Sequence, residues 1–169
     1  AIADQVPLTI IGGSFAFVNF IDAMQNTFST LQLPRGSRLL DAGGFKGRSR
    51  ELNRDDFITL TSHYFGVSQE LCFNLYGLTE LSSQFYSQAS QYKQTPHWTK
   101  VRVCDPITMQ DVEDQQQGVA VLYDLANIAK PFVILTDDLA VAHPGGFELL
   151  GRATGSAPRG CSLSLEEVR

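Results

Sequence analysis

Two strand–turn–helix units follow one another at the start of the sequence, and this repetition restricts the possible folds more than any other feature. Each unit has an apolar run, then a glycine turn, then a segment whose apolar residues recur three or four positions apart. The expected strands cover residues 7–11, 37–42 and 70–75, and the expected helices cover residues 15–31 and 50–64. Successive strand–helix–strand connections within one sheet are right-handed and make the strands parallel. The first half of the chain is therefore predicted to contain a parallel sheet.

The second half has shorter strands and more turn residues. Pro144, Gly145 and Gly146 are expected to form a hairpin turn, and the polar segment 82–94 is expected to be a helix followed by a loop. Strands are expected at residues 101–104, 119–123, 132–135 and 147–150, the third of them buried. Several short strands separated by turn signals are typical of an antiparallel unit, here expected to be barrel-like.

The predicted fold class is α/β, with a short parallel strand–helix–strand sheet followed by an antiparallel, barrel-like β unit. We expect a parallel subdomain over residues 1–95, an antiparallel subdomain over residues 96–152, and a C-terminal tail over residues 153–169.

The composition excludes several classes of protein. Hydrophobic residues make up 43% of the 169 residues and charged residues 18%, which suits a globular domain and not a disordered chain. Because the net charge is −5 and no basic cluster stands out, nucleic-acid binding is not expected. Cys72, Cys104 and Cys161 are odd in number and widely spaced, which argues against a disulfide framework or a zinc site and for a reducing compartment. No apolar run reaches the roughly 20 residues of a membrane span, so a cytoplasmic location is expected.

A candidate ligand site lies where the third expected strand ends. Tyr76, Gly77, Thr79 and Glu80 follow the apolar run of this strand. Tyr76 offers a flat aromatic face, and Gly77 lets a ligand approach the backbone. Thr79 adds a hydroxyl, and Glu80 adds a carboxylate. Ligands of open α/β sheets bind beyond the carboxyl ends of the strands, so this position suits a binding site.

Four short motifs occur in one order along the chain. They are DAGGF at residues 41–45, YGLTE at 76–80, TDDL at 136–139 and GR at 151–152. Together they resemble the GG turn, the YGxTE motif, the TGDL motif and the GR of the adenylate-forming enzymes, over nearly the whole chain from Leu8. The ending from Arg152 onward is most similar to the LuxE-type acyl-protein synthetases, a branch related to phenylacetate-CoA ligase. The chain resembles the C-terminal part of such an enzyme.

The resemblance implies that several motif residues bind the nucleoside part of ATP. It implies that Gly43 and Gly44 let the backbone pass close to the adenine, and that Tyr76, beside Gly77, packs on the adenine face. Asp138 resembles the acid that binds both ribose hydroxyls, and a carboxylate is a natural bidentate acceptor for a diol.

Other motif residues are implied to act on the phosphates. Arg152 resembles an arginine that contacts ribose or phosphate, for which its fixed donors are suited. Thr79 resembles a hydroxyl that contacts the phosphate, and Glu80 resembles the carboxylate that holds Mg²⁺. A hard oxygen ligand fits this chemistry because Mg²⁺ that bridges phosphate oxygens offsets their charge. ATP and Mg²⁺ are therefore the expected cofactors, and Thr79 and Glu80 are candidate catalytic residues.

Each of these residues also has a purely structural interpretation. Tyr76 suits a core aromatic, and Glu80 suits the first turn of a helix, where the macrodipole favours a carboxylate. Asp137 and Asp138 suit a turn cap, and Arg152 suits a surface ion pair. These interpretations do not explain why the motifs occur in this order.

Cys161 is the third candidate catalytic residue. It lies in a tail rich in arginine, glycine and serine rather than in an apolar run, and the nearby Arg159 favours its thiolate. In acyl-protein synthetases a cysteine near the C-terminus accepts the acyl group of acyl-AMP as a thioester, and the resemblance implies this role for Cys161. The alternative is an ordinary tail cysteine.

The sequence therefore predicts ATP-dependent activation of a carboxylic acid as acyl-AMP, followed by acyl transfer to Cys161. The expected type is a long-chain fatty acid–protein ligase. An acyl-accepting reductase or carrier protein is the expected partner. Two alternatives stay open: a CoA ligase or aryl-acid adenylating enzyme of the phenylacetate-CoA ligase type, and an inactive nucleotide-binding module. Asp137 in place of the glycine of TGDL, and the lack of the family's Ser/Thr/Gly-rich phosphate loop, motivate the second. A chain that starts at Ala1 without this loop is expected to be a C-terminal fragment, inactive alone.

Overall fold

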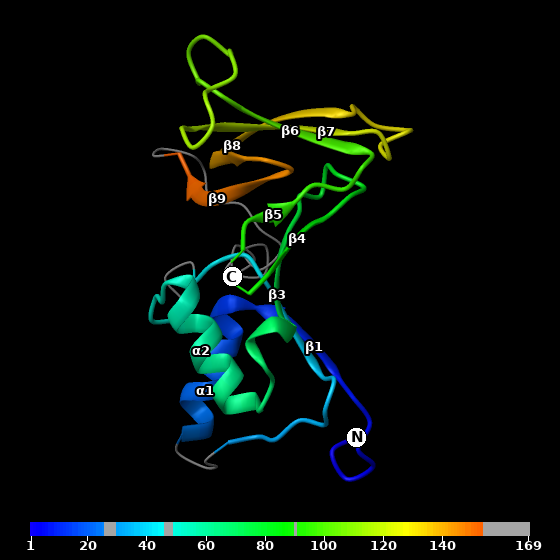
Figure 1. Ribbon diagram of the computed structural model, residues 1–169, viewed down its shortest axis with the longest axis vertical. Helices are drawn as coiled ribbons and strands as arrows, with labels where there is room; N and C mark the ends of the chain where they lie inside the picture. Colours follow the sequence, from blue (N-terminus) through cyan, green and yellow to red (C-terminus); the bar gives the residue numbers. More distant parts are fainter. Residues whose placement is uncertain (26–29, 46–48, 90, 154–169) are drawn as a thin grey trace, which may run out of the picture.

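A parallel α/β half and an antiparallel β half make up the structure (Figure 1). The computed structural model describes residues 1–25, 30–45, 49–89 and 91–153. The first half contains β1 (Thr9–Gly13), α1 (Ser14–Gln25), β2 (Arg38–Ala42), α2 (Arg54–Phe65), a short 3-10 helix (Gln69–Leu71) and β3 (Cys72–Tyr76). The three strands pair in parallel, as the repeated strand–turn–helix pattern predicts.

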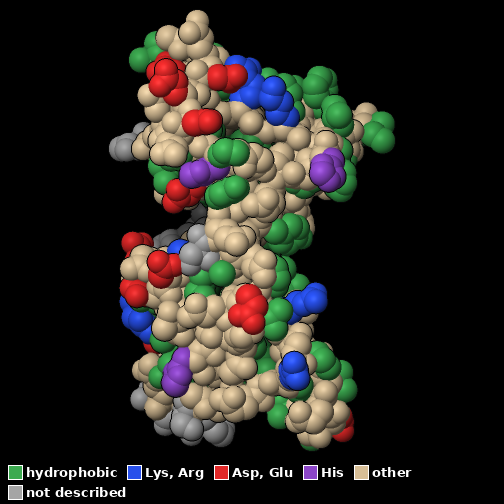
Figure 2. Space-filling view, viewed as in Figure 1, with side chains coloured by type: hydrophobic (Ala, Val, Ile, Leu, Met, Phe, Trp, Pro, Cys, Tyr) green, Lys and Arg blue, Asp and Glu red, His purple; other side chains and the backbone are tan. Residues whose placement is uncertain are grey.

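The second half contains the remaining strands, and all of their pairings are antiparallel. They are β4 (Phe85–Gln88), β5 (Lys93–Gln94), β6 (Thr99–Cys104), β7 (Gln117–Asp124), β8 (Val133–His143) and β9 (Gly146–Arg152). Both halves share one sheet in the order β1-β2-β3-β4-β5-β9-β8-β7-β6, and the molecule narrows between them (Figure 2). The predicted α/β class, with parallel strands followed by antiparallel strands, is confirmed. The division into subdomains at residue 95 stays a prediction.

The antiparallel strands bend around a core of their own. Phe85 on β4, Val103 on β6 and Phe147 on β9 belong to one buried cluster, although β4 and β6 lie far apart in the sheet order. The rings of Phe85 and Phe147 pack edge to face, and their centroids are 5.3 Å apart. Strands from both ends of this half contact a common core only if the sheet curls, which gives the half its barrel-like character.

Local sequence signals determine where α2 begins and ends. The side chain of Asn53 accepts a hydrogen bond from the amide of Asp56 at 2.8 Å. With Asn53 as its N-cap, the helix begins at Arg54. The predicted start at residue 50 is therefore too early. At the other end Gly66 has a φ of 64° and caps the helix, and this left-handed conformation favours glycine. Both helices lie on one side of β1, β2 and β3 (Figure 1) and pack there through rings such as Phe17 and Phe57, 6.1 Å apart.

The first helix is shorter than predicted. α1 ends at Gln25, residues 26–29 lie outside the described residues, and Leu31 is not helical. There its amide donates to the carbonyl of Tyr64 at 2.7 Å, which ties it to the end of α2 instead. Of the helices that the structure describes, none reaches the length and apolarity of a membrane span.

The polar segment 82–94 does not form a helix, so that prediction is wrong. Its residues form β4 and β5. Along β4, Phe85 and Ser87 are buried whereas Tyr86 and Gln88 are exposed, which is the alternation of a strand with one buried face. The glutamines correctly indicate exposed positions, but the period of two in this segment carries the structural signal.

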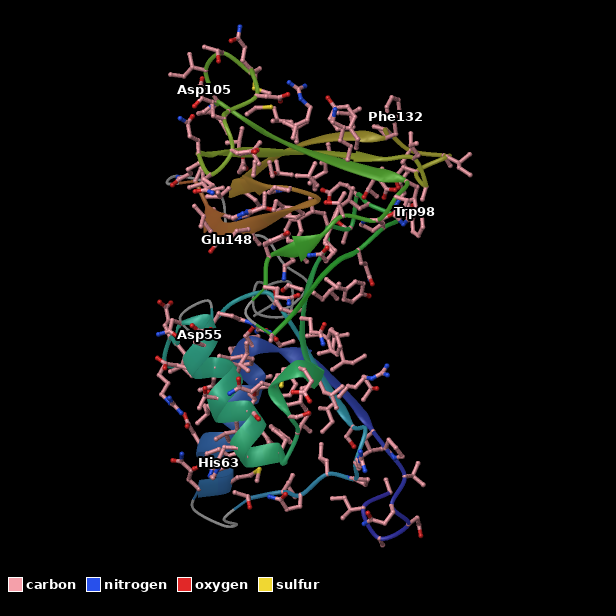
Figure 3. The ribbon with its side chains drawn as sticks, viewed as in Figure 1. Asp55, His63, Trp98, Asp105, Phe132 and Glu148 are labelled. Atoms are coloured by element: carbon pink, nitrogen blue, oxygen red, sulfur yellow. The ribbon has the colours of Figure 1, made fainter. Side chains whose placement is uncertain are left out.

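Strand β8 is longer and more exposed than predicted. The strand was expected to end at the TDDL motif, but it continues through this motif to His143. Phe132 and Leu135 are 52% and 60% exposed, so the predicted burial of residues 132–135 is wrong. Figure 3 shows Phe132 at the outer end of the antiparallel half. An apolar run by itself does not reveal which of its side chains meet a core.

Candidate active site

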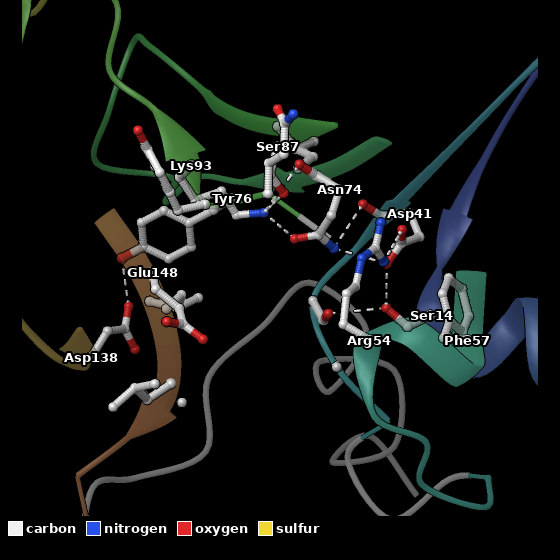
Figure 4. A pocket seen from close by; sticks show the side chains of 18 of the residues that line it. Ser14, Asp41, Arg54, Phe57, Asn74, Tyr76, Ser87, Lys93, Asp138 and Glu148 are labelled. Carbon is white, nitrogen blue, oxygen red and sulfur yellow. Dashed lines mark hydrogen bonds and ion pairs between the residues drawn. The ribbon is translucent and has the colours of Figure 1, made fainter. Parts of the chain in front are cut away.

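A pocket of about 980 Å³ lies where the two halves meet. Its walls come from the turn after β2, from α2 and β3 in one half, and from β5, β8 and β9 in the other (Figure 4). Five of the residues predicted for the site line this pocket: Gly43, Gly44, Tyr76, Asp138 and Arg152. The fold thus brings together residues of all four motifs.

On one wall, Asp138 is held between Tyr76 and Arg152. The hydroxyl of Tyr76 donates to Oδ2 of Asp138 at 2.6 Å, and Nε of Arg152 donates to Oδ1 at 3.1 Å. The β8–β9 register places Asp138 directly opposite Arg152. Burial raises the pKa of Tyr76 far above its ordinary value, and the hydrogen bond to Asp138 raises it further, so the phenol remains a proton donor.

The Asp138 carboxylate keeps acceptor capacity for a ligand. An ionised carboxylate has about four lone-pair positions on its two oxygens, and Tyr76 and Arg152 occupy one on each oxygen. One further position on each oxygen is therefore able to accept a ligand hydroxyl. Since the side chain lines the pocket, this wall suits a vicinal diol such as that of a ribose.

A second polar cluster lies on the opposite wall (Figure 4). The carboxylate of Asp41 accepts hydrogen bonds from Ser14 at 2.8 Å, Arg54 at 2.7 Å and Asn74 at 2.8 Å. Asp41 and Asn74 are neighbours because of the parallel β2–β3 register. The guanidinium of Arg54 also lies 5.4 Å from the ring centre of Phe57. Within the described part of the chain, Nη2 of Arg54 is buried without a hydrogen-bond partner, so a ligand acceptor in the pocket would satisfy it.

Lys93 extends this cluster from the antiparallel half. Its ammonium group donates to the side-chain oxygen of Asn74, to the carbonyl of Asn74 at 3.1 Å and to the hydroxyl of Ser87 at 2.9 Å. Burial and, to a smaller extent, the charge of Arg54 lower the pKa of Lys93 to about 8, while the charge of Asp41 opposes this change. Lys93 on one side and Asp41 on the other fix the orientation of the Asn74 amide.

The turn after β2 offers open backbone to the pocket. Gly43 has a φ of 71°, which favours glycine, and its carbonyl accepts from the Ser14 hydroxyl at 3.0 Å. A Cβ atom added to Gly44 would meet no atom within 4 Å. The missing side chain of Gly44 therefore leaves space for a ligand rather than relieving a contact within the protein.

Three other predicted residues, Gly77, Thr79 and Glu80, do not line the pocket. They are exposed in the loop between β3 and β4, where the hydroxyl of Thr79 donates to Glu80 at 3.1 Å. This loop is not helical, so the interpretation of Glu80 as a helix acid is wrong. Cys161 lies outside the described residues. Among those that are described, no group of three or more His, Cys, Asp or Glu side chains is placed to hold a metal ion.

A comparison of the chain with models of known protein families gives a match over nearly its whole length. The model of the family described as "Acyl-protein synthetase, LuxE" matches residues 1–168. The chain belongs to the LuxE acyl-protein synthetase family. Its similarity extends to a long-chain-fatty-acid–luciferin-component ligase of Aliivibrio fischeri, with 28% identity over 141 residues that cover 77% of this chain. The LuxE-family chain spans 37% of the length of that relative.

Solved structures of adenylate-forming enzymes share the fold of this LuxE-family chain. McyG in complex with phenylalanyl-adenylate has a TM-score of 0.65 at 15% identity, covering 90% of this chain and 31% of its own. A long-chain-fatty-acid-CoA ligase from Archaeoglobus fulgidus has a TM-score of 0.65 at 8% identity, covering 90% and 35%. ATP-bound MatB from Rhodopseudomonas palustris has a TM-score of 0.61 at 13% identity, covering 86% and 31%. At these identities the likeness establishes the fold alone.

The sequence of this LuxE-family chain did not predict the polar cluster formed by Asp41, Arg54, Asn74 and Lys93. A signal existed for Asp41 and Asn74, because each is a polar residue within an otherwise apolar strand. The sequence around Lys93 does not indicate burial, because this lysine lies in a polar run where an exposed side chain is expected. Arg54 likewise reads as a solvent-facing residue of an acidic first helical turn.

Proposed function

We propose that this LuxE-family chain supplies the nucleoside-binding wall of an enzyme that activates a carboxylic acid with ATP and passes the acyl group to a thiol. The observation that carries the proposal is the Asp138 carboxylate, fixed by Tyr76 and Arg152 in a pocket that Gly43 and Gly44 also line. The name of the Aliivibrio fischeri relative supports a long-chain fatty acid as the acid substrate.

In this proposal the adenosine part of the nucleotide occupies the pocket. Asp138 accepts the two ribose hydroxyls through the free positions on its oxygens. The open backbone at Gly43 and Gly44 receives the base, and the unpaired Nη2 of Arg54 donates to one of its acceptor atoms. Tyr76 is buried and its hydroxyl is committed to Asp138. Its main task is therefore to hold the carboxylate in place, besides adding an aromatic surface to the pocket wall.

Thr79 and Glu80 are proposed to act on the phosphate groups. Both are exposed, and the Thr79 hydroxyl is able to turn from Glu80 to a phosphate oxygen. Mg²⁺ is commonly held by one or two carboxylates together with phosphate oxygens, so a single exposed glutamate fits this ion. When bound, Mg²⁺ offsets the negative charge of the phosphates and of the leaving pyrophosphate.

The proposed reaction has two balanced steps. A carboxylate oxygen of the acid bonds to the α-phosphorus while the bond to the bridging oxygen breaks and pyrophosphate leaves. A thiolate then bonds to the acyl carbon, and AMP leaves with the electrons of the broken C–O bond. Cys161 is the proposed thiol, kept reduced in a cytoplasmic compartment. Cys72 and Cys104 are less suited because burial raises the pKa of both, that of Cys72 to about 11.

Further transfer of the acyl group, to a reductase or a carrier protein, is also part of the proposal. A thioester keeps the acyl carbon activated for a second nucleophile or for hydride reduction. The acyl group on Cys161 is therefore proposed to be a covalent intermediate and not the final product. A protein that accepts the acyl group would then determine the product.

Mass spectrometry of the full-length protein that carries this chain tests both steps. With ATP, Mg²⁺ and a long-chain fatty acid, we expect acyl-AMP to form and the peptide with Cys161 to gain one acyl group that hydroxylamine removes. Peptides with Cys72 and Cys104 should stay unmodified. Cys161→Ser should prevent the thioester without stopping acyl-AMP formation.

Two outcomes contradict separate parts of the proposal. If no acyl-AMP forms in the presence of ATP, the activation step is wrong. If acyl-AMP forms while Cys161 remains unmodified, the transfer to this cysteine is wrong, and the CoA ligase alternative gains support.

A further inference from the structure

The loop that carries Thr79 and Glu80 has no helix or strand of its own. Residues 77–84 connect β3 to β4, and this stretch is called the 77–84 loop below. Two buried polar residues of the neighbouring β7–β8 connection face it. Asp124, the last residue of β7, is 0% exposed, and Asn127 in the turn that follows is 4% exposed. Buried polar side chains persist only where hydrogen bonds satisfy them, so their partners indicate what they hold.

Asp124 binds the second part of the 77–84 loop. Its Oδ2 atom accepts the amides of Ser82 at 2.9 Å and Ser83 at 2.8 Å. Its Oδ1 atom accepts the hydroxyl of Ser83 at 2.8 Å and the amide of Ala126 at 3.0 Å. Burial raises the pKa of Asp124, but the hydrogen bonds from Ser83, Ala126 and Ser82 lower it by more, to below its ordinary value. The carboxylate is therefore charged, and charge-assisted hydrogen bonds are the stronger kind.

Asn127 and Lys130 bind the functional part of the loop. The side-chain amide of Asn127 donates to the carbonyl of Glu80 at 2.9 Å, and its oxygen accepts the hydroxyl of Ser82 at 2.6 Å. The ammonium group of Lys130 lies 3.5 Å from the carbonyl of Thr79. The backbone carbonyls of Thr79 and Glu80 are thus both bound by the β7–β8 turn, while their side chains remain exposed.

Trp98, just before β6, connects to the same arrangement. Its indole nitrogen donates to the hydroxyl of Ser83 at 2.8 Å, and its carbonyl accepts the amide of Leu125 at 3.1 Å. Figure 3 shows Trp98 and Phe132 at one end of the antiparallel half and Asp105 near the other end. Two separate segments of this half, the β7–β8 connection and the stretch at Trp98, therefore converge on the loop.

We propose that Asp124 and Asn127 are positioning residues that hold the 77–84 loop so that Thr79 and Glu80 meet the phosphates and Mg²⁺ in a fixed place. This inference rests on the proposed function. The hydrogen bonds run to the loop backbone and to serines, and they leave the side chains of Thr79 and Glu80 available. The ordering of the loop is then achieved on folding, which lowers the cost of orienting the reacting groups.

Isosteric substitutions test the inference. Asn127→Asp keeps the acceptor for Ser82 but loses the donor to Glu80, and Asp124→Asn puts an amide against two backbone N–H groups. Asn19→Asp, on the exposed face of α1, and Asp105→Asn, whose carboxylate also accepts two backbone amides, are the controls with the same charge changes. If Asp124→Asn fails to fold, Asn127→Asp carries the test.

Two measurements are made on the four variants. In this chain, hydrogen exchange at residues 79–83 should accelerate by about tenfold or more in the test variants while exchange in the strands is unchanged. In the full-length protein, acyl-AMP formation should slow on the order of 10- to 100-fold, and the Mg²⁺ concentration for half-maximal rate should rise. The affinity for AMP without Mg²⁺ should stay that of the wild type, because Asp138 and Arg152 are untouched.

The outcomes separate this inference from the proposed function. Unchanged exchange at residues 79–83 would overturn the idea that the β7–β8 turn holds the loop. Faster exchange with an unaltered rate and Mg²⁺ dependence would overturn the positioning role, and so would a loss of AMP affinity in the same proportion as the rate. A wild-type protein that neither binds AMP nor forms acyl-AMP would contradict the proposed function itself, and this inference with it.

Discussion

At the scale of single residues, Lys93 places a positive charge among neutral partners. Its ammonium group contacts the amide of Asn74 and the hydroxyl of Ser87, and Asp41 balances it only through Asn74. Burial of a charge without a direct ion pair costs free energy, which is why the pKa of Lys93 falls to about 8. A group that costs stability beside a pocket is a candidate for a role in the pocket.

The pH dependence of stability should reveal this cost. Between pH 8 and 10.5 the unfolded chain keeps a proton on Lys93 that the folded chain has released, so folding becomes more favourable as the pH rises through this range. Compared with Lys93→Met, the free energy of unfolding of the wild type should increase across the range by about 3 kcal/mol at most. Denaturant unfolding at several pH values measures the difference. A difference that does not change with pH would contradict the assigned burial of the charge.

Cys72 contributes to the pH dependence of stability with the opposite sign. Its pKa is raised to about 11, so above pH 9 the folded chain keeps a proton that the unfolded chain loses, and stability falls. This contribution is the same in the wild type and in Lys93→Met and cancels in their difference.

The same residues show what the sequence reveals of the site. Tyr76 and Asp138 could be identified because each belongs to a motif whose spacing resembles that of a known family. Lys93 and Arg54 belong to no such motif, and burial of a charged side chain depends on the packing of β5 and α2 against other elements. Local sequence does not encode that packing, so half of the polar pocket wall could not be predicted.

At the scale of elements, β5 and β9 approach so closely that a side chain at Gly146 would not fit. A Cβ atom there would lie 2.0 Å from the carbonyl oxygen of Lys93 and 2.8 Å from the ring of Tyr92. Gly146→Ala should therefore displace β5 and destabilise the chain by roughly 1–3 kcal/mol. Gly12→Ala is the matched control, since its Cβ atom would lie 3.4 Å from the ring of Phe17, an ordinary contact. Thermal unfolding compares the two, and equal melting temperatures would contradict the close approach.

The elements themselves were predictable where a pattern extends over many residues. The strand–turn–helix repeats predicted the parallel half and both helices, and a glycine in the left-handed conformation ends α2. The short strands β4 and β5 were missed because a polar composition outweighed an alternation of only four residues. The exposure of residues 132–135 was not predicted, because an apolar run does not indicate whether other elements pack over its side chains.

At the scale of the whole molecule, the pocket lies between two separate cores. One buried cluster surrounds α1 and α2, and another lies inside the curled antiparallel strands. The covalent and sheet connection between them passes through β3, β4 and β5. Gly43 and Asp138 are distant in sequence, so only the resemblance to a family, and no local pattern, predicted that they meet. A ligand that contacts both walls would join the two halves.

This arrangement predicts that AMP protects both halves together. A ligand that binds the folded state stabilises whatever it contacts, so hydrogen exchange with AMP should slow both near Gly43 and Gly44 and along β8 and β9. Asp138→Asn should abolish the protection in both places, because it removes one acceptor of the ribose diol and weakens the bonds to Tyr76 and Arg152. Asp137→Asn is the control, since this exposed neighbour does not line the pocket. Protection confined to one half, or loss of protection in Asp137→Asn as well, would contradict a nucleoside that spans the pocket.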